Sequence, residues 1–262
     1  MKTLRYYILS CLPDGKLFFT KEEALSALEL NNNQFQLQAC RLYEKKLIKN
    51  LGHGFFMIIP PEHGNYGSLP PHWIIDPLMR YLERDYYIGL LSAASIYGAT
   101  EQQPMTFQVV TDKQMRPIAL ERGDIEFHFS KNCHLAAKDQ LTVPTGYANI
   151  STREQTMVDL VRFHAVCGYF ANVAQVVKEM AEECHPEDLA RVIEQESMET
   201  VLQRLGYLLD FFGFGELAYV IEQELAKRSA RYTVLRPDLE AKDGMRLIRW
   251  KLIINDVLGD TL

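Results

Sequence analysis

Cysteine is scarce in this 262-residue sequence, and no Cys-x-x-Cys motif occurs. An odd number of dispersed thiols argues against a disulfide scaffold and fits a reducing compartment such as the cytoplasm. A structural zinc site needs four ligands at recognisable local spacing, and the few His–Cys neighbours supply no matching second pair. We therefore expect free thiols, no metal site and a cytoplasmic location. The cysteines are Cys11, Cys40, Cys133, Cys167 and Cys184.

Long apolar runs are also missing. The most apolar stretch, residues 86–99, contains Gly89 and two serines, and it is shorter than the ~20 residues of a membrane-spanning helix. The first residues contain an apolar run that is too short and too polar-flanked for a secretory signal. With 47% hydrophobic residues, the chain can still form two or three packed units. We expect a soluble protein without a membrane partner.

Motifs of common enzyme classes are absent as well. The sequence has no Walker loop, no nucleophile elbow and no dinucleotide-binding fingerprint. Asp124 and Glu126 could form the carboxylate pair of a metal-dependent nuclease. The lysine that usually accompanies such a pair is replaced by His128, and Asp124 follows a turn, so we interpret Asp124 as a turn residue. We expect no enzymatic activity and no cofactor.

Charge is distributed unevenly along the chain, whose formal net charge is −6. Residues 1–60 contain eight Lys and Arg against five Asp and Glu, a net charge of +3. Residues 61–262 contain 20 against 29, a net charge of −9. A basic segment is the electrostatic footprint of nucleic-acid binding, so such binding is expected only at the N-terminal end.

Residues 19–59 have the pattern of a winged helix-turn-helix. Thr20 and Glu23 form a capping box, which starts a helix. After a second, polar helix, apolar stretches on either side of Gly52-His53-Gly54 predict a β-hairpin over residues 47–59, the wing. Proteins that bind duplex DNA use this order of elements to place the second helix in the major groove.

The second helix begins at the asparagines of residues 31–33, which are good N-cap residues. Phe35, Ala39 and Leu42 recur at helical spacing and should face the core. On the outer side, Asn and Gln can pair with adenine and Arg with guanine, whereas Lys and His suit phosphates. The predicted DNA contacts are Asn33, Gln34, Gln36 and Arg41 for bases or phosphates, and Lys45, Lys49 and His53 for phosphates.

Residues 60–72 contain four prolines and two glycines, which indicates a linker at 61–72 that few contacts should cross. The chain thus divides into a winged helix-turn-helix (1–60) and a larger α+β domain (73–262). Within 73–150 we expect helices at 76–83 and 86–97, then a mostly antiparallel sheet from strands at 105–111, 117–121, 125–129 and 141–143. A second capping box, Ser151 and Glu154, opens a helical bundle at 151–230, and a terminal strand at 245–255 should return to the middle sheet.

Taken together, these segments resemble the AbiEi family of antitoxins, the regulators of bacterial abortive-infection toxin–antitoxin pairs. The resemblance rests on the order and spacing of LYEKKLIKNLGHGFFMI, YYIGLLSAASIYGA, ISTREQTMVDL, RLGYLLDFFGFGELA and RWKLIIND. It implies that the winged domain binds inverted repeats in its own promoter and represses the operon. It also implies that the C-terminal domain neutralises a nucleotidyltransferase-like toxin. Two alternatives remain open: a ligand-sensing winged-helix transcription factor without a toxin, and a catalytic C-terminal domain that is nuclease-like or modifies the toxin.

Overall fold

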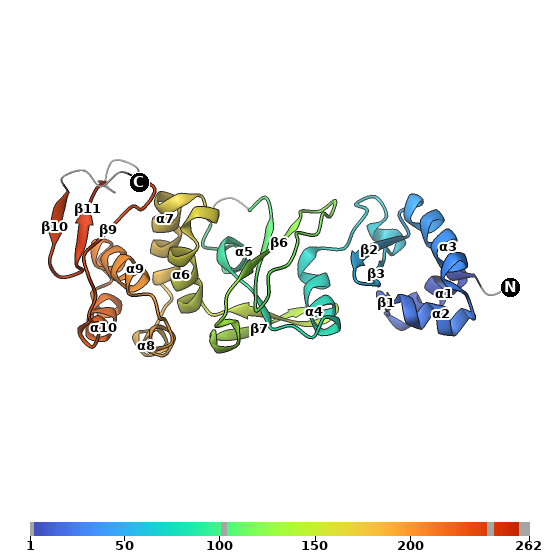
Figure 1. Ribbon diagram of the computed structural model, residues 1–262, viewed down its shortest axis with the longest axis horizontal. Helices are drawn as coiled ribbons and strands as arrows, with labels where there is room; N and C mark the ends of the chain where they lie inside the picture. The colour runs from blue at the N-terminus through green and yellow to red at the C-terminus, as the bar shows by residue number, and fades with distance from the viewer. Residues whose placement is uncertain (1–2, 101–103, 240–243, 257–262) are drawn as a thin grey trace.

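The computed structural model describes residues 3–100, 104–239 and 244–256, and it shows an elongated molecule of mixed α+β class (Figure 1). The described residues form ten α-helices and three β-sheets. Three parts follow one another along the long axis: small helices with a hairpin, a central sheet, and a helical layer that carries the last strands. None of the described helices combines the length and the apolar character that a membrane crossing requires.

The N-terminal part contains three helices packed on a small antiparallel sheet of strand order β1-β3-β2. The predicted helix starts are confirmed, because Thr20 and Glu23 cap α2 reciprocally and Asn31 and Gln34 do the same for α3. Phe35 and Leu42 of α3 are buried as expected. The elements are α1 (Leu4–Cys11), β1 (Phe18–Thr20), α2 (Lys21–Leu28), α3 (Asn32–Glu44), β2 (Ile48–Gly52) and β3 (Phe55–Ile58).

In the hairpin, β3 is buried on both faces, because it belongs to two cores. Phe56 and Ile58 pack toward α1 and α3, whereas Phe55 and Met57 join the core beneath the central sheet. Strands covered on both faces have continuous apolar runs. The expectation that few contacts cross residues 61–72 is therefore wrong: Leu69 is fully buried in the same shared core.

The central sheet has five strands in the order β6-β5-β4-β8-β7. The pairs β5–β6 and β4–β8 are parallel and the other two are antiparallel, so the sheet is mixed rather than mostly antiparallel. Its elements are α4 (Pro71–Tyr81), β4 (Tyr86–Ile88), α5 (Leu90–Ile96), β5 (Phe107–Thr111), β6 (Ile125–Phe129), β7 (Lys138–Val143) and β8 (Gly146–Ser151).

Three details of the central sheet correct the predictions. Residues 86–97 do not form one helix: β4 comes first, and an extended Gly89 separates it from α5. Residues 117–121 contribute a single bridge, from Ile118 to Ile125, instead of a strand. The strand β8 was not predicted, although it pairs with β7 over its whole length.

The helical layer confirms the expected bundle over residues 151–230. Its first helix begins one residue later than predicted, because Ser151 is the last residue of β8 and Thr152 is the N-cap, accepting from the Gln155 N–H. The helices are α6 (Arg153–Arg162), α7 (Tyr169–Ala181), α8 (Pro186–Glu194), α9 (Glu199–Phe211) and α10 (Gly215–Ala226). Short 3-10 turns lie at Leu12–Asp14, Pro61–His63, Cys133–Leu135 and His164–Val166.

The last strands form a separate sheet and do not return to the central one. The strands β9 (Thr233–Val234), β10 (Met245–Leu247) and β11 (Leu252–Ile254) have the order β10-β11-β9. The predicted continuous strand is interrupted by a turn that buries Trp250 against Gly206 of α9. Trp250 is fully buried at this contact and anchors the small sheet on the helical layer.

Candidate functional site

The outer face of α3 is exposed and mainly polar. Asn33, Gln34, Leu37 and Arg41 are all exposed on this helix. Because an α-helix turns ~100° per residue, residues three or four apart share a face. Gln36 is exposed too, but it points ~100° away from Leu37. Among the predicted base contacts, Gln36 is thus the one that lies off the common face.

A surface hollow of about 430 Å³ lies between this face of α3 and the start of α1. The two helices are tied together there, because the Leu4 N–H donates to Oε1 of Gln38 at 2.8 Å. The residues that line the hollow are Thr3, Arg5, Leu30, Gln34, Leu37, Gln38, Arg41, Leu42 and Lys45. Three of the predicted site residues, Gln34, Arg41 and Lys45, are therefore brought together.

The hollow is strongly basic. Its lining includes Arg5, Arg41 and Lys45 and no carboxylate. Across the described ranges, none of these three cations has a salt-bridge partner, whereas Lys16 and Lys49 of the same N-terminal part are paired with glutamates. Arg5 was not among the residues predicted to contact DNA. The excess positive charge of residues 1–60 pointed to the segment, but only the packing of α1 on α3 brings Arg5 beside Arg41.

Two residues of the hairpin that were predicted to contact phosphates, Lys49 and His53, interact with residues outside the hairpin. The Lys49 ammonium lies 2.8 Å from a carboxylate oxygen of Glu121, and its side chain is only 13% exposed. This ion pair offsets the Lys49 charge within the chain, so Lys49 offers a phosphate less charge than an unpaired lysine would, and its phosphate contact stays a prediction. His53 is exposed at the hairpin tip, while its backbone carbonyl accepts from the Tyr81 hydroxyl at 2.7 Å.

The Gln34 side chain also takes part in the N-terminal cap of α3. Its Oε1 accepts from the Asn31 N–H at 3.0 Å, which completes the cap of α3. An amide has two further donors on its nitrogen, so the same side chain can cap the helix and still donate to a ligand. Asn33 and Arg41 have no side-chain hydrogen bond to another described residue.

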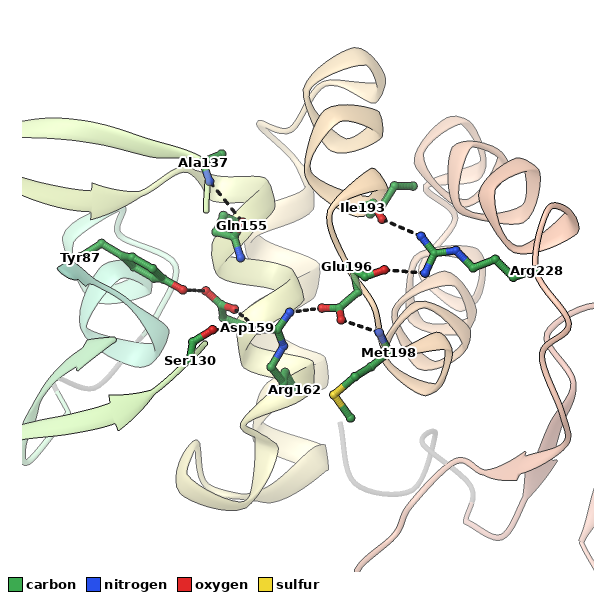
Figure 2. A network of polar contacts seen from close by, with 10 residues as sticks. All are labelled: Tyr87, Ser130, Ala137, Gln155, Asp159, Arg162, Ile193, Glu196, Met198 and Arg228. Carbon is green, nitrogen blue, oxygen red and sulfur yellow. Dashed lines mark hydrogen bonds and ion pairs between the residues drawn. The ribbon is translucent and has the colours of Figure 1, made fainter. Parts of the chain in front are cut away.

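A second polar cluster is buried where the central sheet meets the helical layer (Figure 2). The Tyr87 hydroxyl of β4 donates to Oδ2 of Asp159 on α6 at 2.8 Å. The Arg162 guanidinium, one turn further on α6, pairs with Glu196 and lies 3.9 Å from Oδ1 of Asp159. Glu196 in turn accepts from the Met198 N–H at 2.7 Å. Arg228 donates to the Ile193 carbonyl nearby at 3.2 Å.

The environment of this cluster changes its acid–base properties. Asp159 is fully buried, and burial raises the pKa of its carboxyl to about 6, even though Arg162 acts in the opposite direction. Burial and the neighbouring Asp159 likewise raise the pKa of Tyr87. The Asp159 partner could not be predicted from the sequence, because Tyr87 is 72 residues away. With its bonds directed into the protein, the cluster joins two layers rather than facing a substrate.

The other residues considered as catalytic or metal-binding candidates are Asp124, the histidines and the cysteines. The Asp124 carboxylate accepts from the Leu120 N–H at 3.1 Å, so its interpretation as a turn residue is confirmed. Within the parts of the chain that are described, no group of three or more His, Cys, Asp or Glu side chains is arranged to hold a metal ion. The four buried cysteines and the exposed Cys40 are free thiols.

Comparisons with known structures establish the fold. The crystal structure of the RV2827C protein from Mycobacterium tuberculosis matches with a TM-score of 0.67 and 17% sequence identity, covering 94% of this chain and 89% of that chain. An antigenic nucleotidyltransferase-like protein from Paracoccidioides brasiliensis matches with a TM-score of only 0.36 and 9% identity, covering 60% of this chain and 86% of that chain. No curated protein matches the chain.

A family comparison identifies the region that contains the central sheet and most of the helical layer. Residues 87–211 match the family model of the AbiEi antitoxin C-terminal domain. The matched region begins at Tyr87 and includes Asp159, Arg162 and Glu196, so the buried polar cluster lies inside it. Residues 87–211 of the chain therefore carry an AbiEi antitoxin C-terminal domain.

Proposed function

We propose that this protein is the antitoxin and the DNA-binding autorepressor of a toxin–antitoxin operon, and that it acts without enzymatic activity. The antitoxin role rests on the family match of residues 87–211, and a family of antitoxins implies a toxin partner. We infer that this toxin is nucleotidyltransferase-like, as the AbiEi resemblance of the sequence suggests. Whether the two proteins touch is a separate question from whether one neutralises the other.

The N-terminal part is proposed to be a winged helix-turn-helix. Its order α1-β1-α2-α3-β2-β3, with α2 and α3 separated by a short turn and followed by a hairpin, agrees with that fold. In winged helix-turn-helix proteins the second helix of the motif enters the major groove. Here this helix is α3, whose outer face is exposed and polar.

The observation that carries the DNA-binding proposal is the basic hollow along α3. Three cations without salt-bridge partners among the described residues converge there, in a molecule whose total charge is negative. Unpaired Arg and Lys on a surface are the usual ligands of phosphates, and Arg also recognises guanine. We propose that Asn33, Gln34 and Arg41 contact bases. Arg5, Lys45 and His53 would contact phosphates, with Gln36 at the edge of the interface.

The two ends of the molecule have different tasks in this proposal. Residues 1–60 would bind DNA and residues 73–262 would neutralise the toxin, with residues 61–72 between them. The opposite net charges of the two parts support this division. Because one such module contacts only a few base pairs, inverted repeats occupied by two copies of the chain are the expected operator.

Fluorescence anisotropy with the duplex upstream of the gene tests the DNA-binding proposal. Affinity should fall steeply with salt, because each phosphate contact releases counterions. A scrambled duplex of the same composition should bind more weakly. Arg41→Ala should remove most of that difference. Arg191→Ala is the matched control, because Arg191 is an exposed arginine at the other end of the molecule and should leave binding unchanged. Equal affinity of the unmodified chain for both duplexes would refute the proposal.

Co-expression with the neighbouring open reading frame tests the antitoxin proposal. The full-length chain should restore growth when that reading frame is toxic. The Arg41→Ala variant should restore growth equally well from an independent promoter, because the basic hollow is not part of the matched antitoxin region. If rescue is lost together with DNA binding, the two tasks are not separable and the division of the chain must be abandoned.

A further inference from the structure

Leu37 is an unusual residue on the DNA-facing surface proposed above. It lies near the middle of α3 and is 58% exposed. Its neighbours on the same face are polar, and it lines the basic hollow together with Gln34 and Arg41. More than half of the surface of this leucine is in contact with water in the isolated chain. A ligand that occupies the hollow would remove this apolar surface from water, which is favourable.

The position of Leu37 on the helix determines how deep it would reach. Gln34 precedes it by three residues and Arg41 follows it by four, so the three side chains lie side by side on one face. All three line the same hollow. If Gln34 and Arg41 reach base edges, as the proposed function requires, then Leu37 lies between them at the same depth in the groove.

The major groove offers one apolar group, the C5-methyl of thymine. The other base edges present hydrogen-bond donors and acceptors, which an alkyl side chain cannot satisfy. We propose that Leu37 is a specificity-determining residue that recognises a thymine methyl group in the operator. This inference rests on the proposed DNA-binding function and adds the class of base that the hollow selects.

Replacement of thymine by deoxyuridine tests this contact, because it removes only the methyl group. The probe is the segment upstream of the gene that the full-length chain protects from cleavage, with each thymine replaced in turn. Burying one methyl group is worth a factor of about three to ten in affinity. The unmodified chain should lose that factor at one thymine in each half-site and little at the others.

The variant Leu37→Ala completes a double-mutant cycle with the same duplexes. It should bind the thymine duplex three- to tenfold more weakly and show no further loss with deoxyuridine at the sensitive position. Leu9→Ala is the control, since Leu9 is a similarly exposed leucine (52%) on α1 that does not line the hollow. Leu9→Ala should keep the deoxyuridine profile of the unmodified chain. Circular dichroism verifies that both variants are folded.

The outcomes separate this inference from the proposed function. If the unmodified chain prefers the protected duplex to a scrambled one but no thymine is sensitive, the Leu37 contact is overturned and the DNA-binding proposal stands. The same holds if Leu37→Ala keeps the full deoxyuridine loss. If Leu37→Ala instead abolishes toxin rescue and leaves DNA binding intact, Leu37 contacts a protein. If the unmodified chain has no preference for the protected duplex, both proposals fail together.

Discussion

Asp159 is a carboxyl group without access to solvent, and its charge is unfavourable in the folded protein. Burial raises its pKa to about 6, compared with ~4 in an unfolded chain. Its Oδ2 accepts from Tyr87, but its Oδ1 has no hydrogen-bond partner in the described part of the chain. A carboxylate that is buried and incompletely bonded favours its protonated form. Folding is therefore coupled to proton uptake at this residue.

The variant Asp159→Asn should remove part of the pH dependence of stability. Because the folded pKa is above the unfolded one, the folded state holds more protons between about pH 4 and pH 6, and stability falls as the pH rises through this window. The loss is on the order of 2–3 kcal/mol and is complete above about pH 7. Urea unfolding at several pH values should show a flatter profile for the variant. A profile parallel to that of the unmodified chain would contradict this.

Two cations of the N-terminal part should respond differently to alanine substitution. Lys49 is paired with Glu121, whereas Arg41 has no salt-bridge partner within the described residues. Arg41→Ala should weaken specific DNA binding by ~1–3 kcal/mol with little effect on stability. Lys49→Ala should leave binding nearly unchanged and destabilise the chain by at most ~1 kcal/mol, because the Glu121 side chain is 40% exposed and solvent screens its pair with Lys49. Fluorescence anisotropy measures DNA binding of both variants, and urea titration measures their stability. If Lys49→Ala weakens DNA binding and Arg41→Ala does not, Lys49 rather than Arg41 contacts DNA.

At the scale of elements, α9 holds the C-terminal sheet through several contacts, and the tightest of them is at Gly206. Gly206 of α9 leaves room for the indole of Trp250, and a β-carbon at this position would overlap the six-membered ring. The Trp250 Nε1 also donates to Oδ2 of Asp210 at 3.0 Å. The glycine costs helix propensity, but it permits an aromatic side chain to be fully buried against the helix backbone.

Gly206→Ala should therefore be destabilising, although alanine is the better helix former. Forcing the indole to move costs ~1–3 kcal/mol, the usual penalty for overpacking. Gly215→Ala is a matched control, because Gly215 is the first residue of α10 and has open space at its β-carbon. That variant should be neutral or slightly stabilised. Thermal unfolding compares the two, and equal midpoints would show that Trp250 can be displaced at no cost.

At the scale of the whole molecule, the N-terminal part is attached to the central sheet through a shared core and three specific contacts. Phe55 stacks on Tyr81 with ring centroids 4.8 Å apart. The Tyr81 hydroxyl also donates a hydrogen bond to the His53 carbonyl at the hairpin tip, and Lys49 forms an ion pair with Glu121. The basic hollow and the matched antitoxin region are thus connected through β3, whose residues belong to the N-terminal core on one face and to the core of the central sheet on the other. We expect them to move together rather than as two units on a flexible tether.

A fragment of residues 1–60 should consequently not fold well alone. Without α4 and the central sheet, the apolar side chains of Leu51, Phe55, Met57 and Ile59 would face water. Such a patch favours aggregation and lowers stability. Native-state hydrogen exchange of the full-length chain should give β3 and α4 similar opening free energies, as parts of one cooperative unit. A monomeric fragment with cooperative unfolding would show that the shared core is dispensable for the N-terminal part.

Local signals in the sequence determined the parts of the structure that depend on neighbours along the chain. The caps of α2 and α3 join residues three positions apart, and the buried face of α3 follows from helical spacing. Both features depend on residues that are close in the sequence and require no contact with distant segments. The continuous apolar run of residues 55–59 is also a local signal of burial on both faces, but it does not say which element covers the second face.

Contacts between distant segments were decided only by the tertiary structure. Residues 86–88 form a strand because β5 and β8 supply pairing partners on both sides, while their sequence alone also suits a buried helix. The same holds for the bonds from Tyr87 to Asp159 and from Lys49 to Glu121, each across 72 residues. The approach of Arg5 to Arg41 depends in the same way on how α1 packs against α3. The sequence determines which side chains are available. Which of them come into contact depends on how whole helices and strands pack, and that packing is a property of the complete core.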